Sequence, residues 1–142
     1  ENIKLLKEID LSIDIKFQHD EKEIMFYCDN EQINRVFLNL IKNSIESIHE
    51  KTLKNTDYEK KINIVITNKK DYIETIITDS GTGFSNKDFK NILKPYFTTK
   101  PKGSGLGLSI VNKIINDHKG TIKFKQQDTG AKIIINFDKN VH

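Results

Sequence analysis

The sequence has little of what would define a secreted or membrane protein. Its 142 residues contain one cysteine, Cys28, so no disulfide can form within the chain, and a reducing compartment fits. No apolar run approaches the roughly 20 residues that a membrane span needs, and no signal-peptide pattern opens the chain. The chain also begins without methionine and reads like an internal segment. We therefore expect a cytoplasmic part of a longer protein, which leaves open whether that protein is anchored in the inner membrane.

Arginine is as scarce as cysteine, because Arg35 is the only one. Scattered lysines give a formal net charge of +3. A mild, dispersed excess of this kind is typical of a solvated surface, so we expect contact with neither nucleic acid nor membrane. Hydrophobic residues make up 36% and charged residues 30%, which suits a single folded domain over 1–142.

Alternating apolar residues predict strands, and a polar turn at 68–71 indicates that two of them form a hairpin. The segment 23–28 is interpreted as the partner of the first strand. The expected strands cover 11–17, 23–28, 62–67, 72–78, 121–125 and 131–137.

Apolar residues at helical spacing predict two longer helices. The first runs from 33 to about 49 with Asp29 as its cap, and the second from 107 to 118 with Gly120 as its C-terminal cap. A short helix is also compatible with 87–94. The fold class is therefore α/β: a two-layer sandwich with a mixed, mostly antiparallel sheet and about three helices on one face.

Five of the seven glycines lie in two short stretches, "DSGTG" at 79–83 and "GSGLGLSI" at 103–110. Such clusters indicate unusual backbone angles or the close approach of something to the backbone. The second stretch opens a helix, whose unpaired N–H groups and dipole favour anions, although a simple glycine hinge is the alternative. Its spacing excludes both a Walker loop and the dinucleotide fingerprint.

Polar residues suggest a binding site beside these glycines. Asn39, Asn43 and Glu46 lie within roughly 60° of one another around the first helix. They are either an ordinary polar face or oxygen ligands for a hard cation such as Mg²⁺ and for phosphates. Asp79 ends a strand just before the first glycines. It is either part of an ordinary turn or an acceptor for an amino group on a flat ring.

Taken in order, these motifs resemble the N, G1 and G2 boxes of the ATP-binding fold shared by sensor histidine kinases, type II topoisomerases, a heat-shock chaperone and mismatch-repair ATPases. "PYFTTK" at 95–100 resembles the F box of the kinases. The resemblance covers essentially the whole chain. "NSIESI", "PYFTTK" and "GSGLGLSIV" look most like the nitrogen-regulation branch of the histidine kinases.

The resemblance implies ATP and Mg²⁺ as cofactors. It implies that Asp79 bonds the adenine amino group, that Asn43 ligates Mg²⁺, and that Asn39 lies along the phosphates. Residues 84–102 would form a lid, in which Lys100 offers charge to the γ-phosphate. Asn39, Asn43 and Lys100 are the expected catalytic residues. The expected nucleotide-binding set is Asn39, Asn43, Asp79, Gly81, Gly83, Thr98, Thr99, Lys100, Gly103, Ser104, Gly105, Leu106, Gly107 and Leu108.

Position 39 separates kinases from ATPases within the resemblance. The ATPase relatives carry a glutamate there as general base, and Asn39 cannot accept a proton, so phosphoryl transfer to a protein histidine is favoured. No histidine of this chain has an acceptor context. The acceptor is therefore expected on a separate dimerisation domain, with a response regulator downstream and no autophosphorylation by this chain alone. The alternatives are an anti-sigma-type protein serine kinase and a nucleotide-sensing module that transfers nothing.

Several positions depart from the family pattern. Glu46 and Ser47 stand where many members have a phosphate-binding lysine and an adenine-stacking tyrosine. Ala131 follows Gly130 where a threonine often supports the nucleotide, and the lid contains no arginine.

Overall fold

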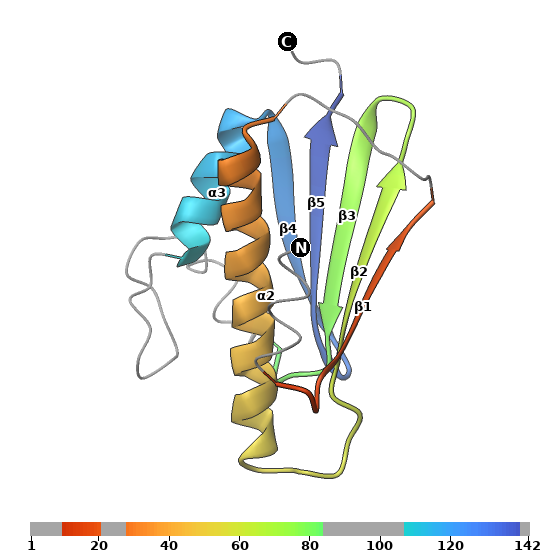
Figure 1. Ribbon diagram of the computed structural model, residues 1–142, viewed down its shortest axis with the longest axis vertical. Coiled ribbons are helices and arrows are strands. Elements are labelled where there is room, and N and C mark those ends of the chain that lie inside the picture. Colours follow the sequence, from red (N-terminus) through yellow and green to blue (C-terminus); the bar gives the residue numbers. More distant parts are fainter. Residues whose placement is uncertain (1–9, 21–27, 84–106, 140–142) are drawn as a thin grey trace.

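The computed structural model describes residues 10–20, 28–83 and 107–139. Within these ranges, five strands form one sheet and two helices cover one of its faces (Figure 1). The elements in chain order are β1 (Asp14–His19), α2 (Asn30–Thr52), β2 (Lys61–Asn68), β3 (Tyr72–Asp79), α3 (Gly107–Asp117), β4 (Gly120–Gln127) and β5 (Gly130–Asp138).

The sheet has the strand order β1-β2-β3-β5-β4. β1 pairs with β2 in parallel, and the other neighbouring strands pair antiparallel. This confirms the mixed, mostly antiparallel sheet and the hairpin between β2 and β3. Of the segment 23–28, expected to pair with the first strand, only Cys28 is described, and it lies in no strand. The helix expected over 87–94 lies outside the described residues.

The helix α2 begins where the sequence places its cap. Asp29 has an extended backbone, and its side chain accepts a hydrogen bond from the N–H of Gln32 at 3.2 Å. The helix buries apolar residues at helical spacing against the sheet and α3. Fully burying a side chain of this size contributes about 1.5–3 kcal/mol, so this face anchors the helix. Its buried apolar residues are Val36, Leu40, Ile41, Ile45 and Ile48.

The end of α3 differs from the expectation. Lys119, not Gly120, takes the left-handed conformation that closes the helix, with φ of 56°. Gly120 instead begins β4, where a Cβ atom would come within 2.8 Å of the Asn136 carbonyl oxygen. The glycine is therefore needed for the close approach of β4 to β5, and predicting it as the helix cap was wrong.

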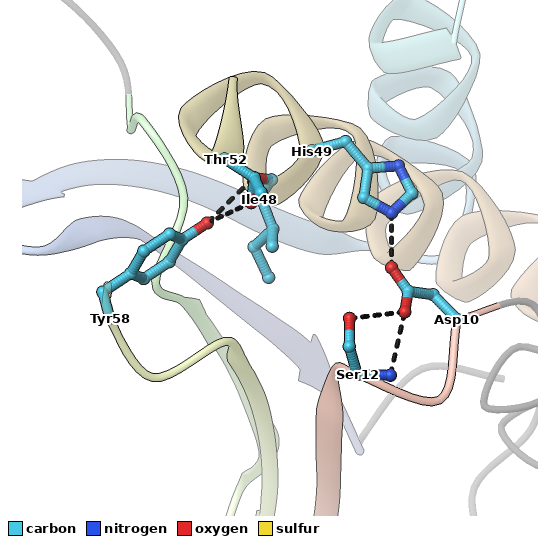
Figure 2. Close-up of polar contacts among 6 residues, drawn as sticks. All are labelled: Asp10, Ser12, Ile48, His49, Thr52 and Tyr58. Atoms are coloured by element: carbon cyan, nitrogen blue, oxygen red, sulfur yellow. Dashed lines mark hydrogen bonds and ion pairs between the residues drawn. The ribbon is translucent and has the colours of Figure 1, made fainter. Parts of the chain in front are cut away.

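The C-terminal end of α2 is held from two sides (Figure 2). On one side the Tyr58 hydroxyl donates to the carbonyl oxygen of Ile48 and bonds the Thr52 hydroxyl, each at 2.9 Å. On the other side Asp10 Oδ2 lies 2.6 Å from Nε2 of His49, while Oδ1 accepts bonds from the N–H and hydroxyl of Ser12. The turn before β1, which replaces the beginning of the expected strand 11–17, is thereby joined to the helix.

The same contacts perturb the titration of Asp10. Hydrogen bonds from the Ser12 side chain, from His49 and from the Ser12 N–H lower the pKa of Asp10 from 3.8 to about 2. The native carboxylate thus stays ionised at pH values at which the unfolded one takes up a proton. Its contribution to stability is complete above about pH 4 and is lost as the pH falls through about 2.

We expect Asp10→Asn to be less stable than the unmodified chain at pH 7, and the difference to shrink between pH 4 and pH 2. Urea denaturation at a series of pH values measures both free energies of unfolding. Asp14→Asn is the matched control, because Asp14 is an exposed carboxylate whose ion pair with Lys16 is long, at 3.8 Å. A stability difference for Asp10→Asn that does not change with pH would contradict this assignment.

Candidate functional site

The sequence motifs converge where the end of β3 meets the polar edge of α2 and the start of α3. The loop after β3 touches α2 through Ser47. At the other end of this edge, a Cβ atom on Gly107 would lie 3.9 Å from Oδ1 of Asn39. The first residue of α3 therefore adjoins the helix that carries both asparagines.

Asp79 is the buried charged group of the site, with only 8% of its surface exposed. Its Oδ1 accepts hydrogen bonds from the backbone N–H of Gly81 at 2.9 Å and of Ala131 at 3.4 Å. A carboxylate removed from water needs such donors. The two bonds come from the loop after β3 and from the start of β5, so they fix the orientation of the carboxylate within the sheet.

Gly130 makes this arrangement possible. Its φ is 133°, and a Cβ atom there would collide with the carbonyl oxygen of Asp79. Only glycine adopts that conformation readily in so little space. The backbone of β5 can therefore come close enough for Ala131 to donate to Asp79.

The loop 80–83 is fastened to its surroundings by hydroxyl groups and by a lysine. Ser80 Oγ accepts a bond from the N–H of Lys61 at 2.9 Å, and Lys51 Nζ donates to the Ser80 carbonyl oxygen at 3.0 Å. Ser47 Oγ accepts a bond from the N–H of Thr82 at 2.9 Å and lies 3.0 Å from the Thr82 hydroxyl. The loop is therefore held against the side of α2.

Two glycines allow this close packing. A Cβ atom on Gly81 would lie 2.8 Å from both the carbonyl carbon and the Cβ of Ser47. Gly83 has a φ of 74°, which other residues rarely adopt, and a Cβ there would meet the side chain of Gln126. The glycines of the first stretch thus serve close approach and an unusual backbone angle, which are the two uses expected of them.

The polar residues of α2 lie along one edge of the helix. Asn39 and Asn43 are half-buried, and Glu46 is exposed. The described ranges contain no group of three or more His, Cys, Asp or Glu side chains that could hold a metal ion. Asn39, Asn43 and Glu46 carry oxygen atoms, which are the kind of ligand that Mg²⁺ accepts alongside several retained waters.

The remaining predicted site residues either pack in the core or lie outside the described residues. Leu108 is half-buried and packs against the hydrophobic core. The lid 84–102 and seven predicted nucleotide-binding residues lie outside the described residues: Thr98, Thr99, Lys100, Gly103, Ser104, Gly105 and Leu106.

Sequence reasoning missed the groups that hold the site together. Ser47 was noted only as a departure from a family pattern, although it faces Gly81 and Thr82. Lys51 and Ser80 were not singled out at all. No local pattern could have revealed these contacts, because they join residues 29 to 35 positions apart.

Comparison with known proteins defines the class. Residues 28–141 match the family described as histidine kinase-, DNA gyrase B- and HSP90-like ATPase. The chain belongs to this family, whose shared domain binds ATP. Among the described residues, no helix is long and apolar enough to cross a membrane.

Within the family, the chain is similar to sensor histidine kinases. A putative NtrY-like sensor histidine kinase of Rickettsia conorii is 38% identical over 124 residues, which cover 87% of this chain and 20% of the relative. The sensory histidine kinase/phosphatase NtrB of Rhizobium leguminosarum is 32% identical over 126 residues, covering 83% and 33%. The chain thus spans a fifth to a third of these relatives, and they support the nitrogen-regulation branch.

A solved structure gives the same result. The catalytic domain of the histidine kinase ThkA matches with a TM-score of 0.81 and 30% identity, covering 97% of this chain and 88% of that chain. ThkA in complex with the response regulator protein TrrA matches with a TM-score of 0.76 and 28% identity, covering 98% and 39%. The fold is therefore that of a histidine kinase catalytic domain.

We expect Gly81→Ala to destabilise the protein by about 1–3 kcal/mol, because the added methyl group would be forced against Ser47. Urea denaturation measures the loss. Ser47→Gly removes two of the three colliding atoms, Oγ and Cβ, so Gly81→Ala should cost less stability in a Ser47→Gly chain than in the unmodified chain.

Gly107→Ala is the matched control for this prediction. Among the residues that the structure describes, its added Cβ would meet only Asn39 Oδ1, at 3.9 Å, which is an ordinary contact, and alanine favours a helix over glycine. Stability should therefore be retained or should rise. Equal losses in the two variants would contradict the packing argument.

Proposed function

We propose that this domain binds Mg²⁺-ATP between the loop after β3, the polar edge of α2 and the start of α3. We further propose that it transfers the γ-phosphate to a histidine on a separate domain of a longer sensor kinase. The observation that carries the proposal is the buried carboxylate of Asp79, oriented by two backbone N–H groups beside a loop of glycines.

The adenine end of the site is assigned to Asp79, Gly81 and Gly83. A carboxylate accepts a hydrogen bond from the exocyclic amino group of adenine, and fixing its orientation in advance lowers the cost of ordering on binding. The two glycines support this assignment because they let the loop pack closely against Ser47 and Gln126, which holds its backbone beside Asp79.

The phosphate end is assigned to Asn39, Asn43 and the start of α3. Backbone N–H groups at a helix N-terminus favour phosphate, and Gly107 opens α3 next to Asn39. Asn43 is the proposed ligand of Mg²⁺, which when bound neutralises charge on the phosphate oxygens. The positive charge of bound Mg²⁺ would also offset the negative charge of Glu46 on the same edge of α2. The remaining phosphate contacts are proposed for Thr98, Thr99, Lys100, Gly103, Ser104, Gly105 and Leu106.

The acceptor histidine is proposed to lie outside this chain. His49 bonds Asp10, and both ring nitrogens of His118 bond backbone groups, so these two imidazoles already serve the fold. Asn39 in place of a glutamate supports transfer to an imidazole over hydrolysis. The relatives are three to five times longer than the matched region, which leaves room for a histidine-bearing dimerisation domain. The ThkA–TrrA complex supports a response regulator as the later partner.

We expect Asp79→Asn to lower the affinity for an ATP analogue at least about tenfold, since a hydrogen bond to a charged group is worth about 1.5–3 kcal/mol. Asparagine keeps an oxygen to accept from Gly81 and Ala131, so the loop should stay in place. Its amide nitrogen, however, opposes the adenine amino group.

Calorimetric titration with and without Mg²⁺ measures this effect and the dependence on the metal. Asp71→Asn, in the exposed turn between β2 and β3, is the matched control and should bind normally. Failure of the unmodified chain to bind the analogue would contradict the proposed function.

Transfer is tested by supplying the histidine-bearing domain of the parent protein together with ATP labelled at the γ-phosphate. We expect label on histidine and no label on this chain alone. Lys100→Ala should slow transfer more than it weakens ADP binding, because the γ-phosphate is absent from ADP. Equal losses would exclude that role of Lys100. Label on serine would favour a serine kinase, and tight binding without transfer would favour a nucleotide-sensing module.

A further inference from the structure

The imidazole of His118 connects two parts of the chain that are far apart in sequence. Its Nδ1 lies 2.8 Å from the carbonyl oxygen of Ile114, one turn earlier in α3. Its Nε2 lies 3.0 Å from the backbone nitrogen of Asp29, which is 89 residues away and caps the start of α2. One side chain therefore joins the end of α3 to the start of α2.

The two partners determine the protonation state of this ring. A carbonyl oxygen can only accept, so Nδ1 carries a proton and donates to Ile114. A backbone N–H can only donate, so Nε2 carries no proton and accepts from Asp29. Only the neutral imidazole with its hydrogen on Nδ1 satisfies both contacts.

Asp29 is itself fixed in place by the helix that it caps. Its side chain accepts from Gln32 N–H and its carbonyl oxygen from Ile33 N–H at 2.9 Å. Its own backbone N–H donates to Nε2 of His118. The contact therefore connects α3 to a rigid point of α2 rather than to a loose loop.

The opposite end of α3 lies at the proposed phosphate site. α3 runs back along the first part of α2, so that Gly107 adjoins Asn39 while His118 adjoins Asp29 (Figure 1). The two helices are in contact, and both contribute to one buried apolar cluster, with Val36 and Leu40 from α2 and Val111 from α3. Apolar burial is non-directional, so it does not by itself select one position of α3 along α2. The hydrogen bond at His118 is directional and specifies one position.

We propose that His118 is a positioning residue for nucleotide binding: its bond to Asp29 sets the position of α3 along α2 and so the distance of the α3 N-terminus from Asn39. This inference rests on the proposed function, since it assumes that phosphates bind at the start of α3. It goes further in assigning a role in phosphate recognition to a residue at the other end of that helix.

Two substitutions separate positioning from simple capping of α3. The amide of glutamine in His118→Gln reaches the place of Nε2 and can accept from Asp29 N–H. The shorter amide of asparagine in His118→Asn reaches only the place of Nδ1 and can donate to Ile114. If His118 positions α3, affinity for a non-hydrolysable ATP analogue should fall about fivefold or more in the asparagine variant and stay within about twofold in the glutamine variant. If His118 only caps the end of α3, the glutamine variant should lose more affinity for the analogue than the asparagine variant.

Adenosine provides the second comparison, because it lacks the phosphates. Its weak binding, followed by NMR shift titration, should be the same in the unmodified chain and in both variants. Nitrogen shifts of His118 in the free protein should report the neutral form protonated at Nδ1. Equal loss of adenosine and ATP-analogue affinity, equal behaviour of the two variants, or a ring protonated at Nε2 would each overturn the inference.

The outcomes also distinguish this inference from the proposed function. If the unmodified chain binds no ATP analogue, the proposed function fails and the positioning role fails with it. If the unmodified chain binds the analogue and both variants match it, only the positioning role is overturned.

Discussion

Asp79 keeps only 8% of its surface exposed, so its carboxylate has lost most of its hydrating water, and the surrounding structure compensates for that loss. The donors are backbone N–H groups of Gly81 and Ala131, which come from opposite directions along the chain. Both are in place only because β3 pairs with β5 in the register that sets Thr78 opposite Lys132, and because Gly130 has no side chain to block the approach. The strand order, the register and one glycine are therefore all conditions for a correctly oriented carboxylate.

One face of the helix α2 packs in the core, and an adjoining edge carries polar residues of the candidate site. Its apolar residues face the sheet, and the edge of that stripe carries Asn39, Asn43 and Ser47. These polar groups keep their places only if the helix does not slide or rotate on the sheet. Directional contacts at both ends oppose such movement: Asp29 meets His118 at the start, and Tyr58 and Asp10 hold the last turns. Apolar burial supplies the stability, and these few polar contacts specify the position.

For the described residues, the sequence was sufficient for most of the helices and strands and insufficient for the contacts between them. Strands and helices were predictable because burial on one face imposes a period of 2 or 3.6 residues, and the Asp29 cap because capping is local chemistry. Gly120 was misassigned because glycine serves both helix ends and close strand approach, and the Asn136 carbonyl that decides between them is distant in sequence. Asn39, Asp79 and Gly107 stood out by helical projection, by a strand end and by glycine spacing, and the roles that the resemblance gives them stay predictions. The contacts of Ser47, Lys51 and His118 arise from packing between distant segments, which local patterns do not encode.

The departures from the family pattern differ in their structural consequences. At position 47, where an aromatic ring would stack on adenine, a serine hydroxyl instead binds Thr82 and holds the glycine loop against α2. At position 131 the backbone N–H holds Asp79, a bond that a threonine there would also make, so the alanine only omits a hydroxyl. At position 47, by contrast, the side chain itself contacts the loop. Affinity in such a site depends on how rigidly the loop is held, because a wall already in its binding position loses little conformational entropy when the nucleotide arrives.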